Sequence, residues 1–148
     1  MIDTEAQDEL KGWLCERIGL VPTPDIRCIG SRSNSRIIGV VGFDSFNGAS
    51  IMMHAAGEPG WLTRKFLWAV FHYPFEMCGV NMVIGLVPSG NAGAIRLNTH
   101  MGFKINAILE GAHPDGALWI MSMGRRECRF LNFNRNRHGQ KIQAATST

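Results

Sequence analysis

The first half of the chain combines one helical pattern with three strand patterns. Residues 4–19 have an amphipathic helical pattern, in which Thr4 is the expected N-cap and Gly19 the expected end. The apolar face of this helix is expected to consist of Leu10, Trp13, Leu14 and Ile18. Strand patterns follow at residues 25–33, 35–46 and 49–57, and Asn47-Gly48 is a hairpin signal between the last two. This half therefore predicts an antiparallel meander.

The second half alternates helices and strands. Residues 61–73 have helical spacing of apolar residues, and Pro74 is expected to interrupt this helix near His72 and to leave Phe75 turned into the core. An almost continuous apolar run at 79–88 is typical of a strand buried on both faces. A helix at 89–102 and strands at 103–111 and 116–124 complete the pattern. The strands that contain Ile51 and Val80 are expected to be parallel neighbours, joined by a right-handed crossover.

The expected fold is a single mixed α/β domain, in which an antiparallel meander is followed by β-α-β-α-β-β. The chain has 148 residues, of which 45% are hydrophobic and 18% charged, and no apolar run approaches the ~18–20 residues that cross a membrane. The N-terminus has no apolar signal segment and the four cysteines are scattered, so we expect a cytoplasmic protein with reduced thiols. His54 and Glu58 are four residues apart but flank Gly57, and we expect no metal site.

The net charge of +3 is concentrated near the C-terminus. Residues 125–141 carry six arginine or lysine side chains against Glu127 alone. Such a segment either contacts nucleic acid or is a solvated terminus. The second interpretation is favoured by the polar composition of the segment. We therefore expect one domain over residues 1–124, a partly flexible basic tail over residues 125–148 and no nucleic-acid partner.

The segment 89–103 begins a helix without an acidic side chain. Its first residues include Ser89, Gly90, Asn91 and Gly93. A helix start usually gains from a nearby carboxylate, because its first N–H groups are unpaired and partly positive. Either the segment starts as an ordinary polar loop, or the helix keeps its N-terminus for an anionic ligand.

The order of motifs around this segment is informative. Phe75-Glu76 end one helix, an aliphatic strand follows from Val80, and the next helix carries Asn91, Ala94 and Leu97 before Gly102-Phe103. Over roughly residues 57–123 this order resembles the GNAT superfamily of N-acetyltransferases, in particular the branch that includes the ribosomal-protein N-terminal acetyltransferases. The resemblance implies that acetyl-CoA lies where two strands splay apart, with its pyrophosphate on the first helix start and its pantetheine arm along the second.

The resemblance also implies which residues contact acetyl-CoA. Ala55 is the expected contact on the strand, and Asn91 is expected to meet the pantetheine arm. The other expected contacts are Gly60, Trp61, Leu62, Thr63, Arg64, Ala94 and Asn98.

Three positions depart from the family pattern. In the pyrophosphate loop, Ala55 replaces a Gln or Arg, and Glu58 replaces a glycine and adds negative charge near the expected diphosphate. Arg64 and Lys65 lie one turn into the helix and are expected to compensate. Asn98 replaces the tyrosine that protonates the CoA sulfur in many relatives, and an amide does not give up a proton. A thiol with a pKa of about 8.5 still leaves as a thiolate near neutral pH.

The expected reaction is transfer of an acetyl group from acetyl-CoA to a primary amine. The candidate general bases are His54 and Glu58, with Asp44 as a weaker one. His54 is favoured because imidazole side chains titrate near neutral pH, while a half-buried structural histidine is an equally good interpretation. Backbone N–H groups of strand residues 52–57 are expected to stabilise the oxyanion. The alternative function is a weakly active or inactive module that binds acyl-CoA or a protein partner.

The sequence leaves the acceptor open among antibiotics, polyamines, lysine side chains and protein N-termini. It also leaves the oligomeric state open. A homodimer would be favoured if the apolar strand at residues 118–123 formed an exposed edge of the sheet.

Overall fold

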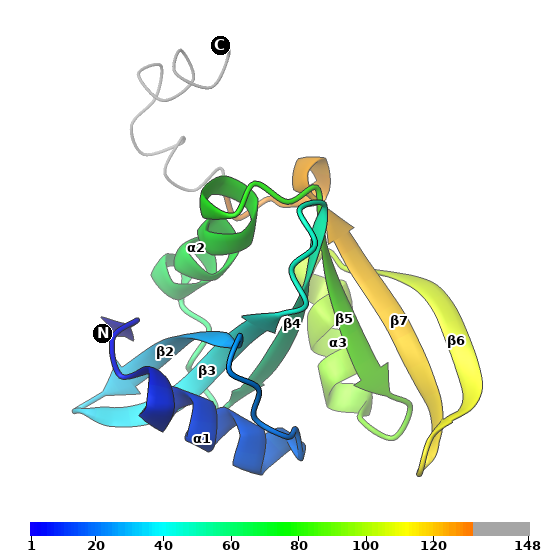
Figure 1. Cartoon of the computed structure of the whole chain (residues 1–148), viewed down its shortest axis with the longest axis horizontal. Coiled ribbons are helices and arrows are strands. Elements are labelled where there is room, and N and C mark those ends of the chain that lie inside the picture. Colours follow the sequence, from blue (N-terminus) through cyan, green and yellow to red (C-terminus); the bar gives the residue numbers. More distant parts are fainter. Residues whose placement is uncertain (132–148) are drawn as a thin grey trace.

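The computed structural model describes residues 1–131, which form one mixed sheet of seven strands with helices on both faces (Figure 1). The strands lie in the order β1-β2-β3-β4-β5-β7-β6. Along the chain the elements are β1 (Ile2–Asp3), α1 (Gln7–Ile18), β2 (Arg27–Ser33), β3 (Arg36–Asp44), β4 (Ser50–Gly57), α2 (Arg64–His72), the π-helical turn η1 (Tyr73–Met77), β5 (Met82–Pro88), α3 (Ala92–Met101), β6 (Lys104–His113), β7 (Gly116–Gly124) and the 3-10 turn η2 (Arg125–Glu127). The expected mixed α/β fold is confirmed. In the described part of the chain, no helix combines the length and apolarity needed to span a bilayer.

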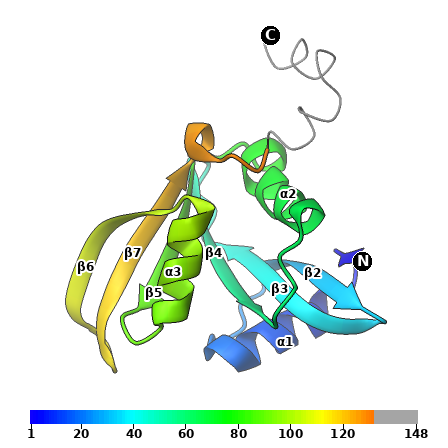
Figure 2. The same cartoon turned by 180° about the vertical axis from the view of Figure 1, so that it is seen from behind.

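The helices divide between the two faces of the sheet (Figures 1 and 2). On one face, which we call the α1 face, α1 packs across β2, β3 and β4, and a Cβ at Gly42 would meet the side chains of Leu14 and Ile26. The other face, the α2/α3 face, carries α2 and α3, and a Cβ at Gly85 of β5 would lie 3.7 Å from Asn98 of α3. Because strand side chains alternate, each strand residue can be assigned to one of these faces.

The strand pairings place β4 at the centre of the sheet. β2, β3 and β4 form the expected antiparallel meander. Ile51 of β4 pairs with Val83 of β5 in parallel, which confirms that these strands are parallel neighbours. β7 pairs antiparallel with β5 and also with β6. β7 therefore lies inside the sheet and β6 is the edge strand, so residues 118–123 do not form the exposed edge that would have favoured a homodimer.

The first helix begins later than the sequence pattern suggests. Gln7 is its first residue and Ala6 its N-cap, so the expected cap at Thr4 is wrong. Asp3 Oδ1 instead accepts hydrogen bonds from the N–H groups of Glu5 (2.9 Å) and Ala6 (3.2 Å). Gly19 ends the helix in the left-handed conformation, with φ 68°, as expected. Ile18 is 38% exposed, and the buried face consists of Leu10, Leu14 and Cys15.

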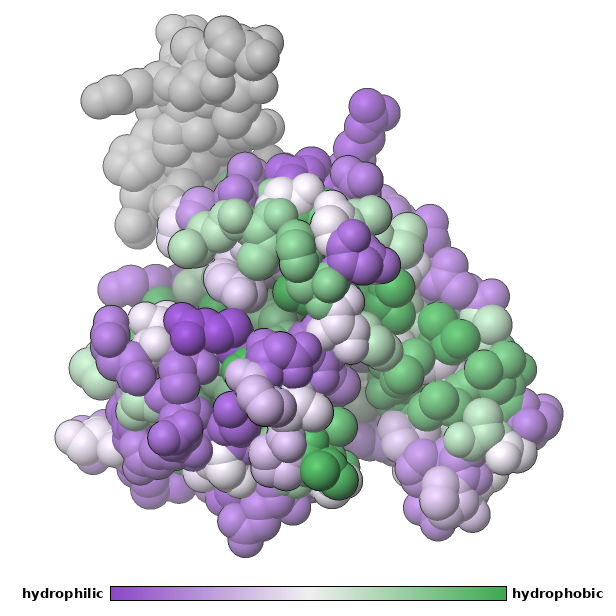
Figure 3. All heavy atoms as spheres, in the orientation of Figure 1, coloured by the Kyte–Doolittle hydropathy of each residue, from purple (hydrophilic) through white to green (hydrophobic). Residues whose placement is uncertain are grey.

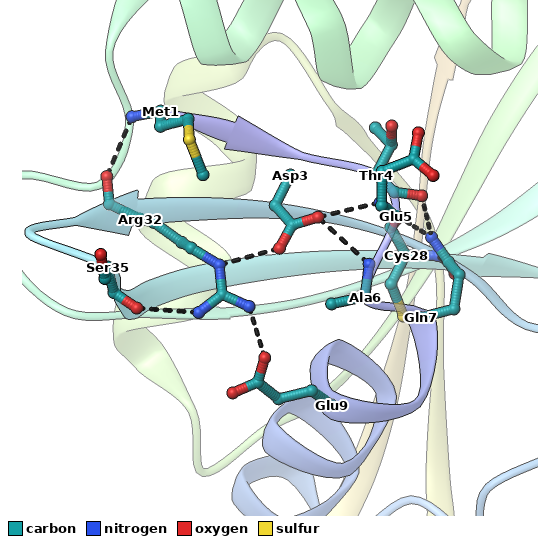
Figure 4. Close-up of polar contacts among 10 residues, drawn as sticks. All are labelled: Met1, Asp3, Thr4, Glu5, Ala6, Gln7, Glu9, Cys28, Arg32 and Ser35. Atoms are coloured by element: carbon teal, nitrogen blue, oxygen red, sulfur yellow. Dashed lines mark hydrogen bonds and ion pairs between the residues drawn. The ribbon is translucent and has the colours of Figure 1, made fainter.

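A polar network holds the N-terminus against β2 (Figure 4). Arg32 on β2 binds Asp3 with Nε (2.8 Å), Glu9 with Nη2 (2.5 Å) and the carbonyl oxygen of Ser35 with Nη1 (2.9 Å). The terminal ammonium of Met1 donates to the carbonyl oxygen of Arg32 at 2.9 Å. These contacts add β1 to the sheet, a strand too short to leave a pattern in the sequence.

The helix before Pro74 ends as expected. α2 stops at His72, the chain continues through η1 as a wider π-helical turn, and Phe75 is fully buried. Cys78 N–H closes this turn on the carbonyl oxygen of Tyr73 at 2.9 Å, which accommodates the missing N–H of Pro74.

Packed structure extends beyond residue 124. Arg125 donates to the carbonyl oxygens of Phe75 and Val80, and Phe130 is 3% exposed within the main core. The domain expected over residues 1–124 therefore continues at least to residue 131. Residues 132–148 of the expected basic tail lie outside the described residues.

Candidate functional site

The two central strands separate along their length. β4 and β5 pair in parallel at three positions only, Ser50 with Met82, Ile51 with Val83 and Met52 with Ile84. From Met53 onward β4 turns away toward α1 while β5 continues beside β7 (Figure 1). We call this opening the splay. The space-filling view in Figure 3 shows the molecule hollowed between its two halves at this place.

Both helices that follow these strands begin without an acidic side chain. α2 follows β4 with Thr63 as N-cap, and its Oγ1 accepts from Phe66 N–H at 3.1 Å. α3 follows β5 with Asn91 as N-cap, and its Oδ1 accepts from Ala94 N–H at 3.0 Å. Neither first turn contains Asp or Glu. Two partly positive helix ends therefore follow the splayed strands, and they suit the negative charge of a diphosphate group.

The loop between β4 and α2 is partly closed on itself. Trp61 N–H donates to the carbonyl oxygen of Glu58 at 3.2 Å, and Thr63 N–H donates to that of Trp61 at 3.2 Å. These two amides are therefore engaged within the loop. The indole of Trp61 is buried against β3 and β4, where a Cβ at Gly39 or Gly57 would come within 2.1 Å of it. Leu62 packs at the margin of the same core, so of this segment the backbone near Gly60 and the first turn of α2 are best placed to meet a ligand.

Glu58 does not lie unpaired in this loop. Its carboxylate binds Arg36 at the start of β3, with Oε2 at 2.7 Å and Oε1 at 3.1 Å from Nη1. The two side chains are partly exposed. Arg36 therefore offsets the negative charge that Glu58 brings to the loop, in addition to the cations Arg64 and Lys65 at the start of α2.

The expected contacts on α3 lie along one side of the splay. Asn91 is exposed at the helix start, and Ala94 is half-buried one turn later. Asn98 lies over β5 and β7, with its Nδ2 4.0 Å from the sulfur of Met121. Ala55 lies on the same side of the sheet, on the other arm of the splay, where it packs against the main core. The structure thus places Ala55, Asn91, Ala94 and Asn98 on the α2/α3 face.

His54 occupies the opposite face. It pairs with Gly42, whose missing side chain faces α1, and its Nε2 lies 2.9 Å from Oδ1 of Asp44 on β3. The His54 and Asp44 side chains are 17% and 13% exposed. A carboxylate only accepts hydrogen bonds, so a neutral imidazole donates from Nε2 and keeps its acceptor lone pair on Nδ1. The pair therefore has the arrangement of a base and the group that sets its tautomer.

The single tyrosine lies elsewhere. Tyr73 packs against Phe43 with ring centroids 5.2 Å apart. It also lines a cavity of about 290 Å³ between α2 and β2, together with Arg27 and Trp68. Burial, followed by interactions with Cys78, raises the pKa of Tyr73. Tyr73 therefore packs from η1 against β2 and β3, away from the splay, and does not occupy the position of Asn98.

Comparison with solved structures relates this geometry to known proteins. The spermidine N-acetyltransferase from Vibrio cholerae, solved with CoA and spermine, has a TM-score of 0.61 at 18% identity over 86% of this chain and 79% of that one. The yncA protein from Salmonella typhimurium, solved with its cofactor acetyl-CoA, has a TM-score of 0.65 at 17% identity over 84% and 92% of the two chains. The ribosomal-protein-alanine N-acetyltransferase from Brucella melitensis has a TM-score of 0.63 at 14% identity over 84% and 99%. The sequence matches no protein-family model and no curated protein.

These comparisons establish the fold as that of GNAT-type N-acetyltransferases, as the resemblance of the sequence implied. The contact between His54 and Asp44 is the part of the candidate site that the sequence analysis ranked too low. A hairpin closed at Asn47-Gly48 sets Asp44 opposite Met52, and His54 then follows on the same face. The register of this hairpin was the signal that could have singled out Asp44.

Proposed function

We propose that this protein transfers the acetyl group of acetyl-CoA to a primary amine. The observation that carries the proposal is the splay of β4 and β5, which are followed by two acid-free helix starts, in a fold shared with N-acetyltransferases. The α2/α3 face provides Ala55, the backbone around Gly60, Asn91 and Asn98 for acetyl-CoA. The thioester would then reach the α1 face through the opening between the strands.

The proposal assigns proton removal to His54. An amine must lose a proton before it attacks the thioester carbon, and a base in hydrogen-bond reach accelerates that step by ~10²–10⁴. Asp44 holds His54 Nε2 at 2.9 Å and so directs the lone pair to Nδ1. Glu58 is the weaker candidate, because its carboxylate is bound to Arg36.

Backbone groups of β4 supply the complementary charge. Beyond Met52 the edge of β4 that faces β5 has no ladder partner on β5, so N–H groups there are available to the thioester oxygen as negative charge develops. The sulfur departs as a thiolate, which is tolerable near neutral pH without a tyrosine. Buried thiols, including Cys28 with its pKa raised by burial to about 11, suit a reducing compartment, and we place the reaction in the cytoplasm.

Turnover with a panel of amines tests the proposal. The protein is incubated with acetyl-CoA and, in turn, an aromatic amine, a polyamine, a peptide with a free N-terminus and a peptide with an internal lysine. Thiol release and the mass of the product are followed together. We expect acetylation of at least one amine by the wild type, and a loss of ~10²-fold or more in kcat for His54→Gln.

His72→Gln is the matched control. His72 stacks on Trp68 at 4.4 Å on the other side of the sheet, so this variant should retain wild-type turnover. Acetyl-CoA binding without acetylation of any amine would favour the binding module. The absence of acetyl-CoA binding would refute both functions.

A further inference from the structure

One part of the α1 face is not covered by a helix. α1 packs on β2, β3 and β4, whereas α3 lies over β5 and β7 on the other side of the sheet (Figures 1 and 2). The uncovered part, which we call the acceptor face, is formed by the side chains of Ile84, Leu86, Ala107, Leu109, Leu118 and Ile120. Figure 3 shows it as a hydrophobic area over these strands.

The strand registers fix the membership of this face. Gly85 and Met121 pair with each other and lie beneath Asn98 of α3. The neighbouring positions therefore point away from α3, and Leu86 pairs there with Ile120. Leu86 is 39% exposed although β5 lies inside the sheet, whereas Leu109, 44% exposed, lies on the edge strand β6, where Ile105 and Ile108 of the other face are similarly exposed. A solvent-exposed apolar surface that spans several adjacent strands is typical of a binding site.

The acceptor face is continuous with the proposed base. Met52 of β4 pairs in parallel with Ile84 of β5, so these two side chains lie next to each other on the α1 face. His54 follows Met52 by two residues on one arm of the splay, and Leu86 follows Ile84 by two residues on the other. His54 and Leu86 thus flank the splay from opposite sides, on the face from which an amine would approach.

Charged groups border this face at two places: the His54–Asp44 pair lies beside it on β4 and β3, and Lys104 of β6 pairs with Ser122. Among the described residues that the registers place on the α1 face of β4, β5 and the paired part of β7, all but His54 are apolar or uncharged. Asp44 on β3, bound to His54, supplies the carboxylate. A protonated amine complements the end of the face beside Asp44, whereas the six side chains of the acceptor face offer burial to an apolar group, and Lys104 at its border is itself a cation.

We propose that the acceptor is a primary amine attached to an apolar or aromatic body, and this inference rests on the proposed function. The ammonium group loses its proton near His54 and Asp44, and its body lies on Ile84, Leu86 and Ile120. The amine nitrogen then forms a bond to the acetyl carbon while the carbon–sulfur bond breaks. The products are an N-acetylated amine and the thiol of CoA: the proton that His54 takes from the ammonium passes to solvent, and the second proton, which the nitrogen loses after attack, passes to the departing thiolate.

Matched amines test this substrate class. Initial rates with acetyl-CoA are compared for 2-phenylethylamine and tryptamine against ethanolamine and spermidine. We expect kcat/KM to favour the two aromatic amines by roughly 30-fold or more, because the apolar body is removed from water in the complex. Equal or faster acetylation of ethanolamine or spermidine would overturn the inference and leave the proposed function intact.

A pair of variants tests the surface. Leu86→Ser should lower kcat/KM for 2-phenylethylamine about tenfold and leave the affinity for acetyl-CoA unchanged. Ile105→Ser is the control, since Ile105 is 47% exposed but pairs with Met121 on the α2/α3 face. Equal effects of the two substitutions would contradict a role for the acceptor face.

A binding measurement tests the inference even if the protein acetylates no amine. Saturable binding of 2-phenylethylamine in the presence of CoA, weakened by Leu86→Ser and not by Ile105→Ser, would support the inference even if the proposed acetyl transfer failed. The absence of such binding would refute it. Sedimentation provides a further test, because a dimer that Leu86→Ser dissociates would show that a second copy, and not the amine, covers this face, and would overturn the inference.

Discussion

Nε2 of His54 on β4 lies 2.9 Å from Oδ1 of Asp44 on β3, and both side chains are largely buried on the α1 face. This contact gives the imidazole a fixed tautomer at the edge of the splay. Because the carboxylate accepts a hydrogen bond from Nε2–H, the lone pair of the neutral imidazole is on Nδ1. Nδ1 is therefore the atom that would take the proton from the amine.

Asp44→Asn should reverse this tautomer. The amide of asparagine can donate to Nε2, which then holds its lone pair toward residue 44 and carries the proton on Nδ1. We expect kcat to fall on the order of 10²-fold, with the affinity for acetyl-CoA unchanged. Steady-state kinetics and cofactor titration measure the two quantities. An unchanged kcat would leave His54 and Asp44 with a structural role.

Glu58→Gln distinguishes the two candidate bases. The substitution removes a charge near the start of α2 and the ion pair with Arg36, but retains the shape of the side chain. We expect acetyl-CoA to bind about twofold more tightly, since an anion is removed near the diphosphate, and kcat to stay within about twofold of the wild type. Calorimetric titration and initial rates provide the check. If kcat falls by more than ~10²-fold, Glu58 is the base and His54 is not.

Much of the fold follows from local patterns. The α2 and α3 segments, the glycine stops at Gly19 and Gly102 and the strand alternation are all set by neighbours in the sequence, so they could be predicted. The start of α1 could not, because Asp3 takes the capping role only once Arg32, 29 residues away, holds it in place. The sequence also offered no basis for the order of β7 and β6 in the sheet, since both segments show a similar local pattern and only pairing with β5 separates them.

The candidate site divides in the same way. The acid-free helix starts and the position of Asn91 are local features, and the sequence indicates them. The splay depends on where the pairing of β4 with β5 ends, and the acceptor face depends on which face α3 covers. The splay and the acceptor face both depend on pairing and packing between residues far apart in the sequence, so no short segment predicts them.

Gly39→Ala should destabilise the protein. A Cβ at this position would lie 2.1 Å from the ring of Trp61, which is enclosed in the core. We expect the free energy of unfolding to fall by about 1–3 kcal/mol, as for other overpacked cores. Gly12→Ala on α1 is the matched substitution, because a Cβ there meets no atom within 4 Å, and it should stabilise the helix by up to ~1 kcal/mol. Urea unfolding measures the free energy of unfolding of both variants. Similar changes in the two variants would contradict the packing described for Trp61.

Asp3 should contribute to stability above mildly acidic pH. The hydrogen bond from Arg32, followed by those from the N–H groups of Glu5 and Ala6, holds the pKa of Asp3 below its usual 3.8. The unfolded chain therefore takes up this proton at higher pH than the folded chain, and the contribution of Asp3 is lost as the pH falls through the lowered folded pKa.

Urea unfolding at pH 6 and pH 3 tests this dependence. Asp3→Asn should lower the free energy of unfolding at pH 6 and do so less at pH 3, where the wild type is already losing the contribution. Asp8→Asn changes an exposed carboxylate on α1 and is the control. An Asp3→Asn effect of equal size at both pH values would show that Asp3 acts as a hydrogen-bond acceptor whose ionisation is irrelevant.

The most direct test of the central claim is a titration of the isotope-labelled protein with acetyl-CoA, followed by the NMR signals of its backbone amides. Binding across the splay predicts saturable shifts at Ala55, Gly85, Asn91 and Ala94, which come from both of its arms and from α3. It predicts no comparable shift at Cys28 or Ala69, which line the separate cavity between α2 and β2. Shifts confined to that cavity, or no saturable shift at all, would contradict an acetyl-CoA-dependent function at this site.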